Sequence, residues 1–161
     1  MSQVEMFKST EPLRVLSLHN PWACLMACGA KPTETRSWGN KYRGDVAIHA
    51  SKGMDKDEKE LCLEQPFADE LVKGGWKTLR DVVATGGHVI CIVELYECEL
   101  MTEEKCRTVE KHHPLDFRFG AWQPGRYAWH TRNVRRLDKP VELRGLQGLY
   151  TWPEGRAICG V

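Results

Sequence analysis

The sequence predicts an α+β protein, mainly β, in which a small and partly closed β-barrel carries helices on its outside. Five or six short segments have the apolar patterns of strands, and turn residues such as Gly86-Gly87 bound them. Two further segments have apolar residues at helical spacing. The chain has 161 residues, of which 42% are hydrophobic, and this is material for one core.

The domain is expected over residues 13–161, because a chain of this length corresponds to a single folding unit. Residues 1–12 mix charged and polar side chains without an apolar run, so we expect a loose leader and no secretory signal. The first strand is expected directly after this leader, at Leu13–Leu18.

A short helix of about two turns should follow this strand. Asn20 is a good helix cap, and Pro21 fits the first helical position. Gly29 suits the end of the helix. Between them lie apolar residues at helical spacing: Trp22, Leu25 and Met26.

The remaining elements follow from the same rules. A strand over Thr33–Trp38 would place Glu34, Arg36 and Trp38 on one face. Residues 55–74 form a charged amphipathic helix that Pro66 interrupts, and residues 101–125 are loop-like with one short helix near Glu103–Glu110. The other expected strands are Asp45–Ala50, the very apolar and central His88–Leu100, Arg126–Leu137 and Leu149–Trp152.

The overall charge balance conceals two basic segments. Lys and Arg number 23 against 22 Asp and Glu, which argues against a uniformly basic nucleic-acid binder. Residues 29–53 nevertheless carry five basic against two acidic side chains, and residues 118–161 carry eight against three. If the two segments meet in space they form the footprint of a polyanion site; otherwise the charges are scattered over a solvated surface.

The cysteines and the hydropathy of the chain indicate the cellular compartment in which the protein is expected. The seven cysteines form no C-x-x-C pair, which favours reduced thiols in a cytoplasmic protein. The longest apolar run, Val89–Val93, is far short of the roughly 20 residues of a membrane helix. We expect no metal and no cofactor, since one imaginable zinc set fits no standard spacing: Cys98, Cys106, His112 and His113.

The most informative segment runs from Gly29 to Arg36 and reads G-A-K-P-T-E-T-R. Lys31 lies just past a helix end, where a cation is favoured. Glu34 and Arg36 stand two apart on a strand, about 7 Å between Cα atoms. By its residues alone this is most simply a salt-bridged strand edge.

The pattern G-x-K-x-x-E-x-R also resembles the signature of the ASCH domain, a family of the PUA-like superfamily. The resemblance spans roughly residues 13–152. It includes a Ser17–Ala23 opening, a Tyr42–Gly44 turn with the strand end Ile48–Ser51, and closing strands near Gly125–Trp129 and Leu146–Leu149.

The resemblance implies a PUA-like β-barrel with a cleft into which the signature Lys, Glu and Arg point. It implies binding of RNA or DNA, in some members with ribonuclease activity. A smaller branch hydrolyses the amide of N4-acetylcytidine nucleosides with a Lys, a Thr three residues later and a Glu on a later strand. Lys31 and Glu94 match the first and last of these, whereas Glu34 stands at the Thr position.

The catalytic candidates are therefore Lys31, Glu34 and Glu94. Glu94 follows Ile90 and Ile92, which we place on the same strand face, so desolvation would raise the pKa of this carboxyl into a range useful for acid–base catalysis. His49 is expected to be a structural histidine.

The ligand-binding candidates combine donors for a phosphate with aromatic rings that can stack on a base. Each aromatic residue taken singly is also a good core residue. The set is Asn20, Trp22, Lys31, Arg36, Ser51, Lys52, Tyr127, Trp129 and Arg132.

The first functional hypothesis is a cleft that binds RNA or another single-stranded nucleic acid, or a modified nucleoside, with ribonuclease activity as one form. The alternative is an amidohydrolase that acts on N4-acylated cytidine-type nucleosides. A further alternative is a non-catalytic protein-interaction adaptor, to which the acidic helix over 55–74 would contribute. No membrane partner is expected.

Overall fold

The computed structural model describes residues 11–161, so the expected leader falls almost wholly outside the described residues. Seven helices cover the sheet: α1 (Trp22–Ala27), α2 (Lys56–Leu61), α3 (Phe67–Lys73), α4 (Leu79–Val83), α5 (Glu103–His112), α6 (Pro114–Arg118) and α7 (Gly155–Cys159). The strands are β1 (Leu13–Leu18), β2 (Thr33–Arg36), β3 (Gly44–Ala50), β4 (His88–Leu100), β5 (Tyr127–Glu142) and β6 (Leu149–Trp152).

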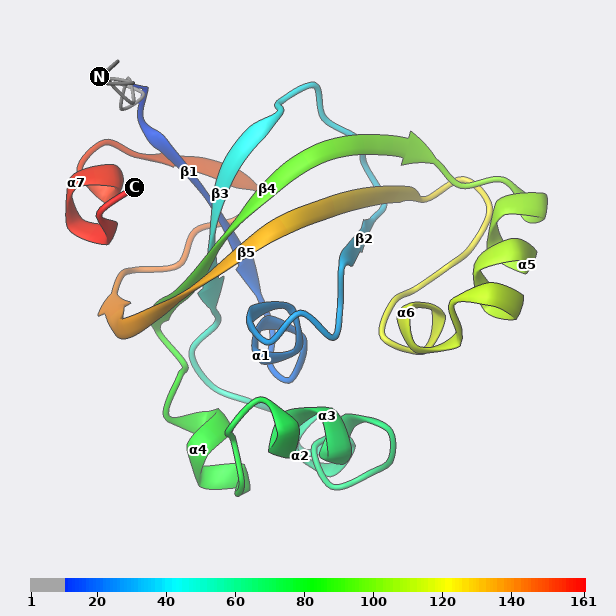
Figure 1. The fold of residues 1–161 in the computed structure, drawn as a ribbon, viewed down its shortest axis with the longest axis horizontal. Coiled ribbons are helices and arrows are strands. Elements are labelled where there is room, and N and C mark those ends of the chain that lie inside the picture. Colours follow the sequence, from blue (N-terminus) through cyan, green and yellow to red (C-terminus); the bar gives the residue numbers. More distant parts are fainter. Residues whose placement is uncertain (1–10) are drawn as a thin grey trace, which may run out of the picture.

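The strands form one mixed, strongly curved sheet in the order β2-β5-β4-β3-β1-β6 (Figure 1). All neighbours are antiparallel except β1 and β3, which run parallel with Ser17 opposite His49. The two edge strands, β2 and β6, do not pair with each other among the described residues, so the sheet stays open. The predicted fold class, a partly closed barrel of an α+β protein, is confirmed.

Helix α1 is the centre of the largest apolar cluster. Every residue from Ala23 to Ala27 is buried, because the helix lies between the sheet and α3. Figure 1 shows α2, α3 and α4 together at one end of the molecule and α5 and α6 beside the far ends of β4 and β5. None of the described helices is long and apolar enough to cross a membrane.

Several element boundaries differ from the sequence-based expectations. Pro21 is the N-cap of α1 rather than its first helical residue, and β2 ends at Arg36. Three short helices were not expected: α4, α6 and α7. A capping box at Thr78, whose hydroxyl accepts from the amide of Asp81, begins α4 and is visible in the sequence.

The predicted interruption of the charged helix at Pro66 is confirmed. The segment divides into α2 and α3, and Pro66 is the N-cap of the second helix. The seven cysteines are free thiols, and burial raises the pKa of Cys24 to about 12. These buried thiols are therefore packed as small apolar side chains.

Candidate functional site

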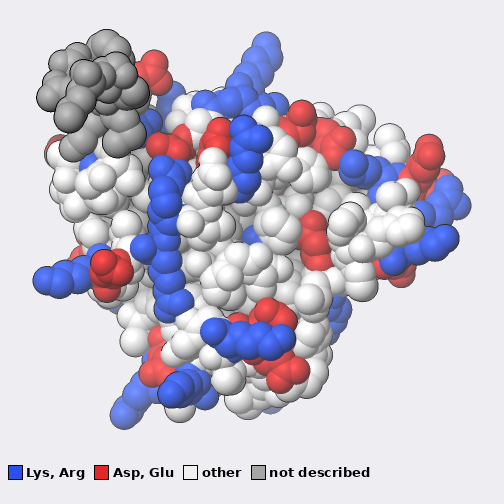
Figure 2. Space-filling view, in the orientation of Figure 1, with Lys and Arg blue, Asp and Glu red and all other residues white. Residues whose placement is uncertain are grey.

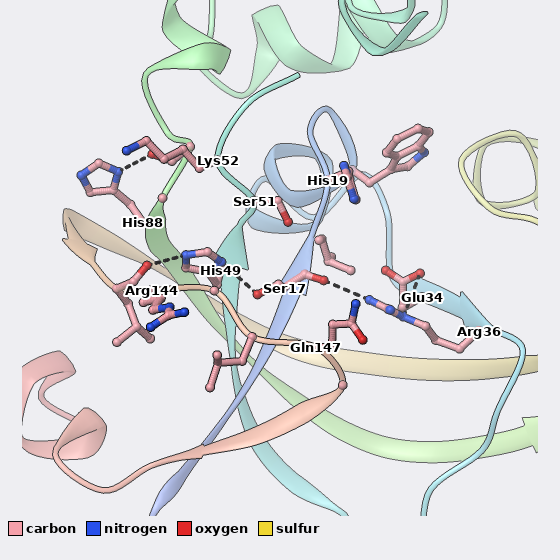
Figure 3. Close-up of a pocket in the computed structure, with 18 of the residues that line it drawn as sticks. Ser17, His19, Glu34, Arg36, His49, Ser51, Lys52, His88, Arg144 and Gln147 are labelled. Carbon is pink, nitrogen blue, oxygen red and sulfur yellow. Dashed lines mark hydrogen bonds and ion pairs between the residues drawn. The ribbon is translucent and has the colours of Figure 1, made fainter. Parts of the chain in front are cut away.

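A large cleft opens where β1 and β3 end, facing β2 and the segment of residues 142–148 (Figure 3). Its volume is about 1360 Å³. The end of β1, the start of α1 and β2 come from the signature half of the chain, whereas residues 142–148 follow β5. The fold thus brings two distant parts of the sequence to one cavity.

The signature arginine fixes one wall of the cleft. The Nη2 atom of Arg36 donates to the main-chain oxygen of Ser17 at 3.0 Å, and its Nε lies 3.9 Å from Oε1 of Glu34. Glu34 in turn accepts a hydrogen bond from the amide of Thr35 at 2.9 Å. The Nε atom of Arg36 is buried and has no hydrogen-bond partner among the described residues, so this guanidinium keeps a donor free.

The signature lysine lies beneath this wall. Lys31 is only 2% exposed, and its Nζ donates to the main-chain oxygen of Thr33 at 2.6 Å. Burial lowers the pKa of Lys31, and the charges of Glu34 and Asp116 oppose that shift. Lys31 lines a second cavity of about 300 Å³, which shares Trp22, Glu34, Thr35 and Arg126 with the large cleft. Glu34 therefore lies between two adjoining cavities, and Lys31 lines the smaller one only.

The two basic segments of the chain meet in the large cleft. Arg36 and Lys52 come from the first segment, and Arg126 and Arg144 come from the second. Three carboxylates share the lining: Glu34, Glu58 and Glu142. Among the described residues, the side chains of Lys52 and Arg144 have no hydrogen bond and no ion pair, so both charges face the opening unpaired.

Figure 2 shows Lys and Arg interspersed with Asp and Glu over much of the face in view, with one longer run of Lys and Arg down its left part. The gathering of cations is thus not confined to the lining of the cleft.

Two tryptophans border the cleft. Trp22 is half-buried and Trp38 is 37% exposed. Trp38 meets the buried ring of Trp129 edge to face, with 4.7 Å between centroids, and its main-chain oxygen accepts from Nε1 of Trp129 at 3.1 Å. The buried ring of Trp129 thus packs behind Trp38 and holds it in place, and Trp38 is the ring that a ligand could reach.

A serine–histidine pair lies in the wall of the cleft beside Arg36, which bonds to the main-chain oxygen of Ser17. Oγ of Ser17 is 3.0 Å from Nδ1 of His49, and Nε2 of His49 is 2.7 Å from the main-chain oxygen of Leu143. A carbonyl oxygen only accepts hydrogen bonds, so Nε2 carries the proton. Burial lowers the pKa of His49, so the ring is neutral and its bare Nδ1 accepts the hydroxyl proton of Ser17.

The expectation of a raised pKa for Glu94 is wrong. The carboxylate is bound by Nε and Nη2 of Arg132, at 2.9 and 3.1 Å, and by the amide of Asn133 at 2.6 Å. These donors hold the pKa of Glu94 below its usual value. Contrary to expectation, Glu94 does not share one apolar strand face with Ile90 and Ile92. The pairing of β4 is irregular, and the two isoleucines lie in different apolar clusters.

The structure separates the remaining candidates. Glu94 pairs with Asp45, at the other end of β3 from His49. Arg132 binds the Glu94 carboxylate and therefore lies at that end too. Asn20 is 1% exposed, and its amide bonds to Thr85, Val82 and the main-chain nitrogen of Cys24. Of the residues predicted from the sequence, the following line the large cleft: Trp22, Glu34, Arg36, Ser51 and Lys52. Those that line neither cavity are Asn20, Glu94, Tyr127, Trp129 and Arg132.

Sequence reasoning missed several residues of the cleft: Ser17, Trp38, His49, Arg126 and Arg144. Ser17 and His49 stood within the quoted motif segments, but the parallel pairing of their strands carries no local signal. Within residues 11–161 no three His, Cys, Asp or Glu side chains gather into a set that could hold a metal ion.

Comparison with known proteins gives one family and a set of similar folds. A model described as ASCH domain matches residues 16–141. A crystal structure of ASCH from Zymomonas mobilis is similar over 91% of this chain and 92% of that chain, with a TM-score of 0.53 and 12% identity. No curated protein matches the chain.

Two variants of the Zymomonas mobilis protein are similar to the same degree. The Tyr-to-Phe variant gives a TM-score of 0.55 at 13% identity, over 93% of this chain and 98% of that chain. The Ser-to-Ala variant gives 0.54 at 13% identity, over 95% and 98%. At this level of identity the likeness concerns the fold.

Proposed function

The chain belongs to the ASCH domain family, and from this premise we propose that it binds single-stranded RNA in the large cleft. The observation that carries the proposal is the meeting of the two basic segments there, with Lys52 and Arg144 unpaired among residues 11–161. Unpaired cations around a cavity are suited to phosphate oxygens, since no protein carboxylate must first be displaced.

The shape of the cleft supports a chain rather than a small molecule alone. Its volume of about 1360 Å³ exceeds the roughly 300–1,000 Å³ of ordinary small-molecule sites. Cations come from both sides, with Arg36 on one wall and Lys52 on the other (Figure 3). A backbone that crosses the cleft would pass both.

The aromatic border favours unpaired bases. Base stacking on an aromatic ring requires a base that is free of its own helix, so Trp22 and Trp38 suit a single strand or a nucleoside better than a duplex. Trp38 is held in place by Trp129, which fixes the plane of the ring before any ligand arrives. A modified nucleoside would occupy the same aromatic border without needing the outer cations.

Binding of a fluorescent single-stranded RNA, followed by anisotropy from 50 to 300 mM salt, tests the proposal. We expect micromolar affinity that falls steeply with salt, since bound phosphates release counterions. The matched DNA strand and an RNA duplex serve as competitors. Binding that is flat with salt, or equal for single strand and duplex, would contradict the proposal.

A second candidate function is hydrolysis in the smaller cavity that adjoins the cleft. It is supported by Lys31, a nearly fully buried lysine with a lowered pKa, which lines this smaller cavity together with Glu34. A product assay with short RNAs and with N4-acylcytidines separates ribonuclease from amidohydrolase activity. Lys31→Ala should abolish either activity; turnover that survives this substitution would remove Lys31 from the mechanism.

A further inference from the structure

Ser17, His49 and the main-chain oxygen of Leu143 form a continuous hydrogen-bonded series in the wall of the cleft (Figure 3). The Leu143 oxygen fixes the ring by accepting from Nε2 of His49. The lone pair of Nδ1 then points at the hydroxyl of Ser17, which has no other hydrogen-bond partner for its side chain among the described residues. A hydroxyl whose proton is held by a neutral, fixed imidazole is the arrangement of an activated nucleophile.

We propose that Ser17 is a nucleophile and His49 its general base, and that together they cleave a carboxylic ester or amide brought into the cleft. This goes beyond the proposed RNA binding and does not depend on it.

The geometry allows a complete acyl-transfer cycle. Oγ of Ser17 adds to the carbonyl carbon while its proton passes to Nδ1 of His49. The bond to the alcohol or amine then breaks, the leaving group takes that proton, and the acyl group remains as an ester on Ser17. A water molecule adds to this ester and gives a proton to Nδ1. Collapse returns that proton to Oγ and releases the carboxylic acid.

Two neighbours support the assignment. The guanidinium of Arg36 is bonded to the main-chain oxygen of Ser17, so a cation is held next to the residue that carries the nucleophile, where it would stabilise negative charge that develops on the substrate. Gly145 packs over the pair: a Cβ at this position would stand 2.8 Å from Cε1 of His49 and 3.3 Å from Oγ of Ser17. Only glycine therefore fits against the pair, and this close packing holds the His49 ring in place.

A fluorophosphonate is the suitable probe, because it reacts with activated serines and discriminates against the seven free thiols of the chain. In this reaction the Oγ–P bond forms, the P–F bond breaks, fluoride leaves, and the serine proton passes through His49 to solvent. Mass spectrometry of the intact protein gives the stoichiometry, and peptide mapping gives the site. Heat-denatured protein measures the background, and Ser37→Ala is the matched control, since Ser37 also lines the cleft.

We expect one label per chain on Ser17, no label on Ser17→Ala, and a rate reduced about 10²- to 10⁴-fold in His49→Gln. The wild-type rate should also fall on acidification, as His49 takes up a proton. This pH profile keeps the base testable if the His49 variant does not fold. Labelling at background level, at another residue, or equally in Ser17→Ala and Ser37→Ala would overturn the proposal. So would a rate that does not fall on acidification at any pH at which the protein stays folded.

Discussion

The guanidinium of Arg36 donates a hydrogen bond to the main-chain oxygen of Ser17 at 3.0 Å, although three strands separate β2 from β1 in the sheet. This contact is possible only because the sheet curls far enough to bring its first and fifth strands together. Arg36 thus links β2 to β1 across the open side of the barrel, at the point where the cleft forms. The signature arginine has a structural role in addition to its place in the lining of the cleft.

Arg36→Lys should therefore lower the free energy of unfolding by about 1–3 kcal/mol, because lysine keeps the charge but loses the planar fork that reaches Ser17. Urea denaturation measures the change. Arg43→Lys is the matched control, since the Arg43 side chain is exposed and bonds only to nearby main-chain oxygens. Equal losses in both variants would show that the contact across the open side contributes nothing.

Lys52→Gln and Arg144→Gln should each weaken RNA binding several-fold and reduce the slope of log affinity against log salt by about 0.7. Stability should stay unchanged, because neither side chain has a partner in the part of the chain that the structure describes. Anisotropy titrations and thermal melts measure the two effects. Lys111→Gln, on the exposed side of α5 and away from the cleft, should alter neither quantity.

Trp38→Ala should weaken RNA binding by about 1–3 kcal/mol, the contribution of one stacked base. Trp38→Phe should recover part of it, since a smaller ring still offers a face. Trp76→Phe is a control outside the cleft. If the alanine and phenylalanine variants at position 38 bind alike, no base stacks there.

The positions of these tryptophans show what sequence can and cannot predict. Composition and the signature predict aromatic rings near the site. They favour Trp22, which lines the cleft, but also Trp129 and Tyr127, which do not, because a strand pattern does not reveal which rings the helices and loops cover. In the structure Trp129 is 1% exposed and Trp38, two residues beyond the unexpectedly early end of β2, reaches the opening.

Acidification should destabilise the protein through His49. Its folded-state pKa is lowered by burial, so below the ordinary value of 6.5 the unfolded chain takes up a proton that the folded chain refuses. The stability is fully present above pH 6.5 and is lost as the pH falls from there toward the folded-state pKa. Urea denaturation from pH 5 to 8 measures it.

His49→Gln should remove this dependence and leave a flatter profile over the same range. His88, whose electrostatic interaction also lowers the pKa of His49, remains in the variant and is the internal control. The carboxylates with lowered pKa values titrate below this window, so they do not disturb the comparison. Identical slopes for wild type and variant would contradict the assigned neutral state of His49.

Glu94→Gln should leave RNA binding within twofold of wild type. The carboxylate lies at the far end of β3 from His49 and is occupied by Arg132 and Asn133. The same anisotropy titration measures the affinity. A loss comparable with that of Arg144→Gln would place Glu94 in the ligand site after all.

Glu94 also marks a limit of strand patterns. Period-two alternation assigns faces correctly only while the pairing is regular, and β4 shifts register three times against β5. By contrast the motif predicts Glu34 and Arg36 on the cleft, because both lie in a short strand of regular pairing. The Ser17–His49 pair joins residues 32 apart, and only the parallel pairing of β1 with β3 brings them together.

The most direct test of the central claim is the position of RNA on the protein. A single-stranded RNA that carries 4-thiouridine is photocrosslinked to the full chain, and the linked peptides are identified by mass spectrometry. We predict crosslinks in the segments that contain Trp22, Trp38 and residues 142–148, which border the cleft. Crosslinks confined to the outer face around Tyr96 and Arg132, with none in these segments, would contradict the account.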